Sequence, residues 1–180
     1  MGALHSIGKG KKSRQWTSCL HFYTGDGEWK PLQEHEIIAY FRDELDAGEE
    51  FIVFSEIRKY NVGCWLFGLC GYWHEYTLVK TTNWHWSFEK MEQGIFVQRS
   101  KSRDQVRCYF GGKRRKPDRT EGRSSLVSFG ENILDVVGWI IDRNELRNAY
   151  RSIVSSHHFA SLLYEAITRT KENRRLDNTE

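Results

Sequence analysis

The sequence predicts an α+β fold, in which helices pack against an antiparallel sheet. A segment with helical spacing is followed by a run of short strand-like segments, and then by a helix, a strand and a last helix. Strands that follow one another along the chain commonly pair antiparallel, so this order favours the α+β class. Aromatic residues make up 14% of the 180 residues, which is ample for a packed core.

The first predicted helix covers residues 33–47. Four apolar residues recur there at helical spacing, and Gly48 fits a C-terminal cap; the four are Ile37, Ile38, Phe41 and Leu45. Residues 1–15 are predicted to be a flexible basic tail. Residues 16–32 read as irregular, with Pro31 just before the helix.

The middle of the chain is rich in strand patterns. We expect five strands, at residues 51–57, 74–80, 84–89, 94–99 and 106–110. Thr81-Thr82-Asn83 is typical of a hairpin turn between the second and the third. The later elements are a basic loop at 111–125, a helix at 131–141, a strand at 149–154, a helix at 156–170 and a polar tail at 171–180. Residues 16–170 would form a single domain.

Composition narrows the class of protein. The net charge is only +3, so any electrostatic role must come from local clusters. No stretch of about 18 apolar residues is present, so no membrane-spanning helix is expected. Four cysteines fit neither a disulfide scaffold nor a zinc site, which predicts reduced thiols in a cytoplasmic protein. We expect no metal and no cofactor.

The N-terminus matches the pattern for N-myristoylation. Gly2 would be acylated after removal of Met1, and Ser6 occupies the favoured position. One myristoyl chain binds a membrane only marginally, and Lys9, Lys11 and Lys12 would supply the second signal. These residues predict attachment at the inner face of a membrane.

Three residues carry the chemistry that the sequence offers. Ser156 lies at the predicted start of the last helix, where free backbone N–H groups favour negative charge. His74 and His85 lie on two strands that a hairpin would bring together. A serine beside an imidazole is typical of acyl transfer, although a helix start followed by packing residues explains the same pattern.

The chain resembles the lecithin-retinol acyltransferase-like family, which includes phospholipase A/acyltransferases and the H-box/NC-box proteins of some picornaviruses. The segment Gly48-Glu-Glu-Phe-Ile-Val-Phe54 is similar to the opening strand of that family, and Trp73 to Lys80 to its H-box strand. Ser155-Ser156-His157-His158-Phe159 is similar to the NC-box. The resemblance covers residues 47–168. It implies a circularly permuted papain-like fold with that range as its core, His74 as the catalytic histidine and His85 as its orienting partner.

The departures from the family pattern predict weak or absent catalysis. Ser156 stands where the family has its nucleophilic cysteine, and Glu75 replaces a tryptophan. A hydroxyl needs a general base during attack, whereas a thiol can be ionised beforehand by its surroundings. We therefore expect a pseudoenzyme or very weak acyl-transfer enzyme that acts as a lipid- or protein-binding module. The alternative is an active acyltransferase or acyl hydrolase using Ser156, with Cys64 or Cys70 as a less favoured source of a thiol.

A basic segment completes the set of candidate sites. Between residues 97 and 123 ten Lys or Arg stand against three Asp or Glu, and four adjacent cations form the densest cluster: Lys113, Arg114, Arg115 and Lys116. A solvated loop, an anionic-lipid patch and nucleic-acid binding are the competing interpretations. Membrane lipids are the expected partners, with a protein partner as a further option. Nucleic acid is not expected, because no known motif for it is present.

Overall fold

The computed structural model describes residues 15–25, 27–61, 73–115, 118–119, 123–127 and 130–168. In chain order, its elements are β1 (Leu20–Tyr23), β2 (Trp29–Leu32), α1 (Glu34–Asp43), the short 3-10 helix η1 (Ala47–Glu49), β3 (Ile52–Asn61), β4 (Trp73–Thr81), β5 (His85–Met91), β6 (Gly94–Ser100), α2 (Arg103–Cys108), β7 (Tyr109–Phe110), β8 (Lys113–Arg114), β9 (Asp118–Arg119), β10 (Ser124–Leu126), α3 (Ile133–Asp142) and α4 (Ile153–Thr168). The predicted α+β class is confirmed.

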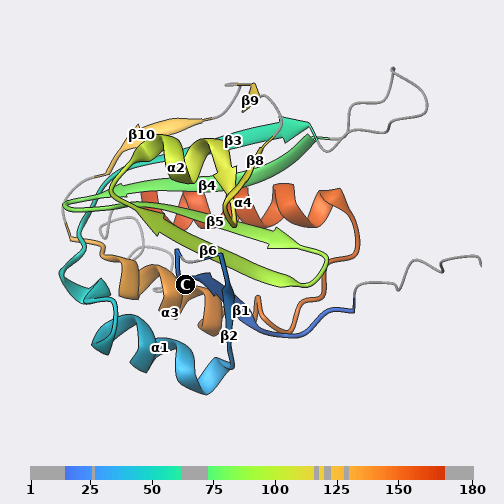
Figure 1. Cartoon of the computed structure of the whole chain (residues 1–180), viewed down its shortest axis with the longest axis horizontal. Helices are drawn as coiled ribbons and strands as arrows, with labels where there is room; N and C mark the ends of the chain where they lie inside the picture. The colour runs from blue at the N-terminus through green and yellow to red at the C-terminus, as the bar shows by residue number, and fades with distance from the viewer. Residues whose placement is uncertain are drawn as a thin grey trace, which may run out of the picture.

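One eight-stranded sheet organises the molecule. Its strand order is β10-β3-β4-β5-β6-β1-β2, and β9 also pairs with β3. All its pairs are antiparallel except β1 with β6, which run parallel. The hairpin β7–β8 forms a separate two-stranded sheet. In Figure 1, α4 lies behind the sheet, while α2 and β8 lie in front of it.

The side of the sheet that bears α4, here called the α4 face, carries the main core. Side chains of β4, β5 and β6 alternate between the two sides, and Val79, Trp86 and Val97 point to this one. They pack in one cluster with α1, α3 and α4, including Phe41, Ile140, Phe159 and Leu163. Thr77 confirms the direction, because its hydroxyl donates to the Ala160 carbonyl oxygen of α4 at 3.2 Å.

The opposite side, the α2 face, is covered by a short helix and a hairpin. Tyr76 and Leu78 pack there against Val106 of α2. The Tyr76 hydroxyl also donates to the Arg107 carbonyl oxygen at 3.1 Å. A side chain of β4 therefore points either to the α4 face or to the α2 face, and this choice decides which residues of the candidate site can meet.

Local sequence explains where α1 and α3 begin. Both start with a capping box, in which the residue before the helix and the third helical residue satisfy each other's backbone N–H groups. In α3 the partners are Asn132 and Asp135, with both bonds at 2.9 Å. In α1 they are Gln33 and Glu36. A capping box of this kind contributes about 1 kcal/mol to a helix start.

Four segments differ from the sequence predictions. Residues 16–32 are not irregular, because β1 and β2 lie there and β1 is fully inside the sheet. The predicted strand 106–110 is the end of α2 followed by β7. No strand is present at 149–154, where the Arg151 N–H donates to the Ser155 hydroxyl as α4 starts at Ile153. The basic loop 111–125 contains three short strands, β8, β9 and β10.

The core also begins earlier than residue 47. Leu20, Phe22 and Leu32 are buried in the same cluster as Phe159 and Ile167. Thus the N-terminal strands share one core with the last helix, and the range that resembles the acyltransferase-like family is only part of the packed unit.

Candidate functional site

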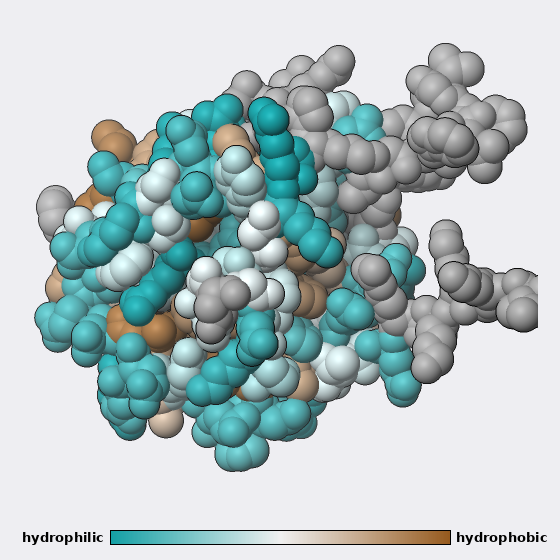
Figure 2. Space-filling view, in the orientation of Figure 1, coloured by the Kyte–Doolittle hydropathy of each residue, from teal (hydrophilic) through white to brown (hydrophobic). Residues whose placement is uncertain are grey.

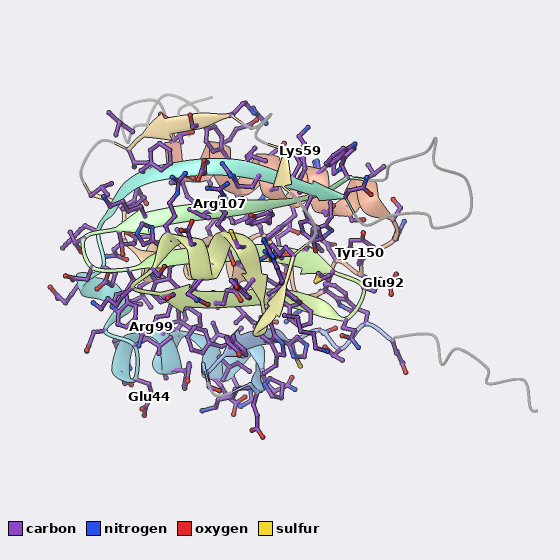
Figure 3. All side chains as sticks on the ribbon, turned by 45° about the horizontal axis from the view of Figure 1, so that its top comes forward. Glu44, Lys59, Glu92, Arg99, Arg107 and Tyr150 are labelled. Carbon is purple, nitrogen blue, oxygen red and sulfur yellow. The ribbon has the colours of Figure 1, made fainter. Side chains whose placement is uncertain are left out.

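Ser156 is a buried residue in the second turn of α4. Its exposed fraction is 0%, and its hydroxyl is hydrogen-bonded to that of Tyr150. Burial and the nearby Glu92 raise the pKa of Tyr150, and the bond to Ser156 opposes that rise. Figure 3 places Tyr150 and Glu92 together at one end of the sheet. Ser156 therefore has a hydroxyl partner and is not exposed to solvent.

His74 lies on the opposite side of the sheet from Ser156. Thr77 of β4 points to the α4 face, so by alternation His74 points to the α2 face. There its ring packs beside Tyr60 with centroids 5.1 Å apart, and Nε2 lies 3.4 Å from Glu89 Oε2. The expectation that His74 could serve Ser156 as a base is wrong in this geometry, because the backbone of the sheet stands between them.

His85 does not meet His74 either. The register pairs His85 with Lys80, six residues along β4 from His74. At about 3.3 Å per residue this separates the two histidines by about 20 Å. Burial, Lys80 and Arg103 lower the pKa of His85, so its ring is neutral at neutral pH. The predicted hairpin exists, but its tight turn at residues 82–83 places His85 beside the turn.

A buried ion-pair cluster occupies the place around His74. Glu89, Arg115 and His74 have side chains 0–3% exposed, and the Arg115 guanidinium is hydrogen-bonded to Glu89. The Tyr60 hydroxyl donates to Glu89 Oε2 at 3.3 Å. Arg115 also lies over the Tyr76 ring at 4.4 Å. The cluster thus ties β3, β4, β5 and the segment after β8 together.

The charge of Glu89 is held by these neighbours. Burial alone would raise its pKa, but the Arg115 guanidinium and the His74 ring together lower the pKa of Glu89 to about 2. Burial and Glu89 raise the pKa of Tyr60. Glu89 is therefore ionised at neutral pH, and its carboxylate oxygens contact Arg115, His74 and Tyr60. A carboxylate with so low a pKa is a poor general base.

The residues similar to the NC-box serve to pack and orient α4. His157 Nε2 lies 2.6 Å from the Trp73 carbonyl oxygen, and Nδ1 lies 3.9 Å from Glu75 Oε1. Ser155 caps the helix start through Arg151, and Phe159 is 1% exposed in the main core. His158 is exposed. The five residues form about one and a half turns of α4.

The basic cluster is divided by the hairpin β7–β8. Lys113 and Arg114 on β8 are exposed, whereas Arg115 is buried against Glu89 and cannot bind a surface ligand, which corrects its assignment as an anion-binding residue. Figure 2 shows strongly hydrophilic side chains over α2 and β8 on this side. The other predicted surface or site residues lie outside the described residues: Gly2, Lys9, Lys11, Lys12, Cys64, Cys70 and Lys116.

The hairpin rests on an aromatic cluster. Gly111 and Gly112 have φ of +53° and +75°. A Cβ on Gly111 would lie 2.5 Å from Trp29 Nε1, and one on Gly112 would lie 2.8 Å from the Tyr23 hydroxyl oxygen. Trp29 packs in turn on Phe110 with centroids 4.8 Å apart. The turn is therefore held against β1 and β2, with β8 outermost.

No family model, curated protein or solved structure matches this chain. Its function has to be argued from the geometry of the residues described above. Among them, no three His, Cys, Asp or Glu side chains lie close enough together to hold a metal ion. The described helices also include none that is both long and apolar enough to span a membrane.

Sequence reasoning missed Glu89 and the buried pair Lys90–Glu145, in which Nζ lies 2.7 Å from Oε2. Glu89 follows Trp86 and Phe88 at alternating positions, a pattern typical of an acid that faces solvent. The available signal was Arg115, placed just after a Gly-Gly turn that could fold it back over the sheet. Without the hairpin geometry, that signal did not identify its partner.

Proposed function

We propose that this chain is a non-catalytic binding module that associates with anionic membrane surfaces. The absence of catalysis is supported by the position of Ser156, which is buried on the α4 face and hydrogen-bonded to Tyr150. Both candidate imidazoles, His74 and His85, point to the α2 face. A serine nucleophile needs a base within about 3 Å or one water away. The sheet between Ser156 and His74 supports the proposal that neither arrangement forms.

The membrane half of the proposal is supported by the hairpin β7–β8. Its cations Lys113 and Arg114 are exposed, and the turn beside them is anchored on Trp29 and Tyr23. A preorganised pair of cations gains about 1 kcal/mol per residue near an acidic bilayer. That gain is small alone, but it adds to the binding of a myristoyl chain on Gly2, which is marginal on its own.

We also propose that the chain has the permuted papain-like fold of the lecithin-retinol acyltransferase-like family. The element order supports it: β3 follows Gly48-Glu49-Glu50, β4 carries the H-box-like segment, and α4 carries Ser155 to Phe159 and packs across β3, β4 and β5. The side of β4 that faces α4 bears Glu75 and Thr77 instead of His74. We propose a permuted papain-like scaffold that has kept its frame and lost its catalytic pairing.

Vesicle co-sedimentation tests the membrane proposal. The protein is produced with N-myristoyltransferase, and its binding is compared on vesicles with and without phosphatidylserine. Lys113→Glu/Arg114→Glu should weaken binding to the acidic vesicles by at least about tenfold, because two attractive charges become repulsive. Gly2→Ala should abolish most of the remaining binding.

The matched control is Arg143→Glu/Arg147→Glu, which changes net charge equally in the connection after α3. Both arginines are exposed, and Arg147 pairs with Glu34 of α1, away from β8. This variant should bind like the wild type. Equal losses in the two double variants would reduce the effect to net charge and refute a hairpin-specific site.

A serine-reactive fluorophosphonate probe tests the absence of catalysis. The wild-type protein should remain unlabelled, because the Ser156 hydroxyl is inaccessible and lacks a base. A fluorescent phospholipid should likewise not be hydrolysed or used for acyl transfer. Labelling that disappears in Ser156→Ala, with a correctly folded variant, would overturn the non-catalytic assignment.

A further inference from the structure

A groove between α3 and α4 has a composition unlike the rest of the molecule. Its volume is about 390 Å³. The ionisable side chains that line it are three acids, Glu131, Asp135 and Asp142, and no Lys, Arg or His among the described residues lines it. The whole chain carries a net charge of +3, so an all-acidic lining is a local reversal of sign.

The floor and walls of the groove are apolar. Leu134 and Trp139 of α3 are half-buried, and the remaining lining residues are Val136 and Gly138 of α3 and Leu163, Ala166 and Ile167 of α4. The other side of α3 is buried in the main core through Ile133, Val137 and Ile140. An apolar floor with an aromatic wall and a charged rim is the usual make-up of a protein-binding groove.

Two residues of this lining are unfavourable for the helix that contains them. Gly138 is in the interior of α3, where glycine costs about 1 kcal/mol relative to alanine. A Cβ there would meet nothing within 4 Å, so packing does not require glycine. Asp142 ends α3, where the helix dipole disfavours a carboxylate by about 0.3–1 kcal/mol, and it forms no ion pair within the described part of the chain.

Local choices that weaken an element without a compensating contact are expected at functional positions. Both residues contribute to the groove: Gly138 leaves space along its wall, and Asp142 adds negative charge to its rim. Arg143, the adjacent cation, has its guanidinium carbon 5.9 Å from the Trp139 ring centroid and lines a different hollow beside Lys90 and His158. Among the described residues, the charged side chains that line the groove are therefore all carboxylates.

We propose that the α3–α4 groove binds a basic, amphipathic segment of a partner protein. The apolar face of the segment would lie on Leu134, Trp139 and Ala166, and its cations would face Asp135 and Asp142. Charge complementarity decides this occupant: the same carboxylates would repel the headgroups of anionic lipids. The ten residues of α3 span about 15 Å, which matches about three turns of a partner helix. This site is separate from the membrane surface proposed above and goes beyond it.

Fluorescence anisotropy with a model peptide tests the proposal. The probe is a fluorescein-labelled peptide of about fourteen residues, with leucine and lysine at helical spacing, which corresponds to about four helical turns. A second peptide carries glutamate in place of each lysine. We expect saturable binding of the leucine–lysine peptide only. Absence of binding, or equal binding of both peptides, would overturn the assignment while leaving the vesicle result unaffected.

Variants locate the site. Gly138→Met should weaken binding at least about tenfold by filling the groove, with an equal or higher thermal midpoint because a better helix former replaces glycine. Asp142→Lys, a surface change, should also weaken binding. Asp104→Lys makes the same charge change on exposed Asp104 of α2 and should have no effect. Unchanged binding in Asp142→Lys, equal loss in Asp104→Lys, or displacement of the peptide by oleate would refute a basic-peptide groove.

Discussion

At the scale of single residues, Glu89 is the position whose environment departs furthest from its sequence pattern. It is completely buried, and Arg115, His74 and Tyr60 surround its carboxylate. Burying an ion pair is costly, and removing one partner is costlier still, because the other charge stays buried and uncompensated. His74, which the sequence offered as the base of an acyl-transfer pair, therefore belongs to a cluster that holds the α2 face together.

The pH dependence of stability provides a test of this cluster. The pKa of Glu89 is lowered from its ordinary 4.5 to about 2 in the folded protein. Its contribution to the free energy of unfolding is therefore present above about pH 4.5 and is lost as the pH falls towards about 2. The expected loss is on the order of 3 kcal/mol, measured by urea unfolding followed by tryptophan fluorescence.

Two variants separate this effect from that of other carboxylates. Glu89→Gln should lower the free energy of unfolding at neutral pH by about 3–5 kcal/mol, because Arg115 stays buried without its partner. Glu89→Gln/Arg115→Met should recover most of that loss and should depend less on pH than the wild type. A double variant with the wild-type acid sensitivity would show that Glu89 is not the group responsible.

At the scale of elements, the sequence predicted the helices and strands that have a regular apolar period. It missed the elements whose conformation depends on contacts with distant parts of the chain. The segments containing α1, α3, β4, β5 and β6 were placed within a few residues, since each has its own apolar period or cap. By contrast, Val106, Cys108 and Phe110 alternate like a strand, but α2 covers the first two. Val106 packs on Tyr76 and Leu78, and this tertiary contact overrides the alternation.

The hairpin β7–β8 can be tested through its glycine turn. Gly111→Ala should lower the free energy of unfolding by about 1–3 kcal/mol, because a Cβ at φ +53° is strained and would meet Trp29 at 2.5 Å. Gly48→Ala is the matched control, since a Cβ there meets nothing within 4 Å. It should stay within about 0.5 kcal/mol of wild type in chemical denaturation. Equal effects would mean that the turn is not held against Trp29.

At the scale of the whole molecule, the sheet is what separates the candidate residues. The resemblance to the acyltransferase-like family placed a histidine strand and a serine helix in a plausible order along the chain. The register of β4 then turned His74 to the α2 face and Thr77 to α4. Because side chains alternate along a strand, a shift of one residue would have reversed that outcome.

The N-terminal strands are a second case in which a contact between distant segments is not visible in the local sequence pattern. β1 lies between β2 and β6, and its Phe22 ring packs near Phe41 and Trp86. Its parallel pairing with β6 joins segments more than 70 residues apart. Such a long-range pairing has no local signature, so residues 16–32 read as irregular although Leu20 and Phe22 complete the core.

The sequence by itself determined the α+β class, the approximate extent of the regular helices and the hairpin turn between β4 and β5. These features depend on periodicity and turn chemistry within a few neighbouring residues. Only the tertiary structure decided that Ser156 is enclosed, that His74 lies beside the buried Glu89, and that α3 and α4 leave an acidic groove between them. Those outcomes depend on which face of a strand or helix meets which distant partner, and short-range patterns do not encode that choice.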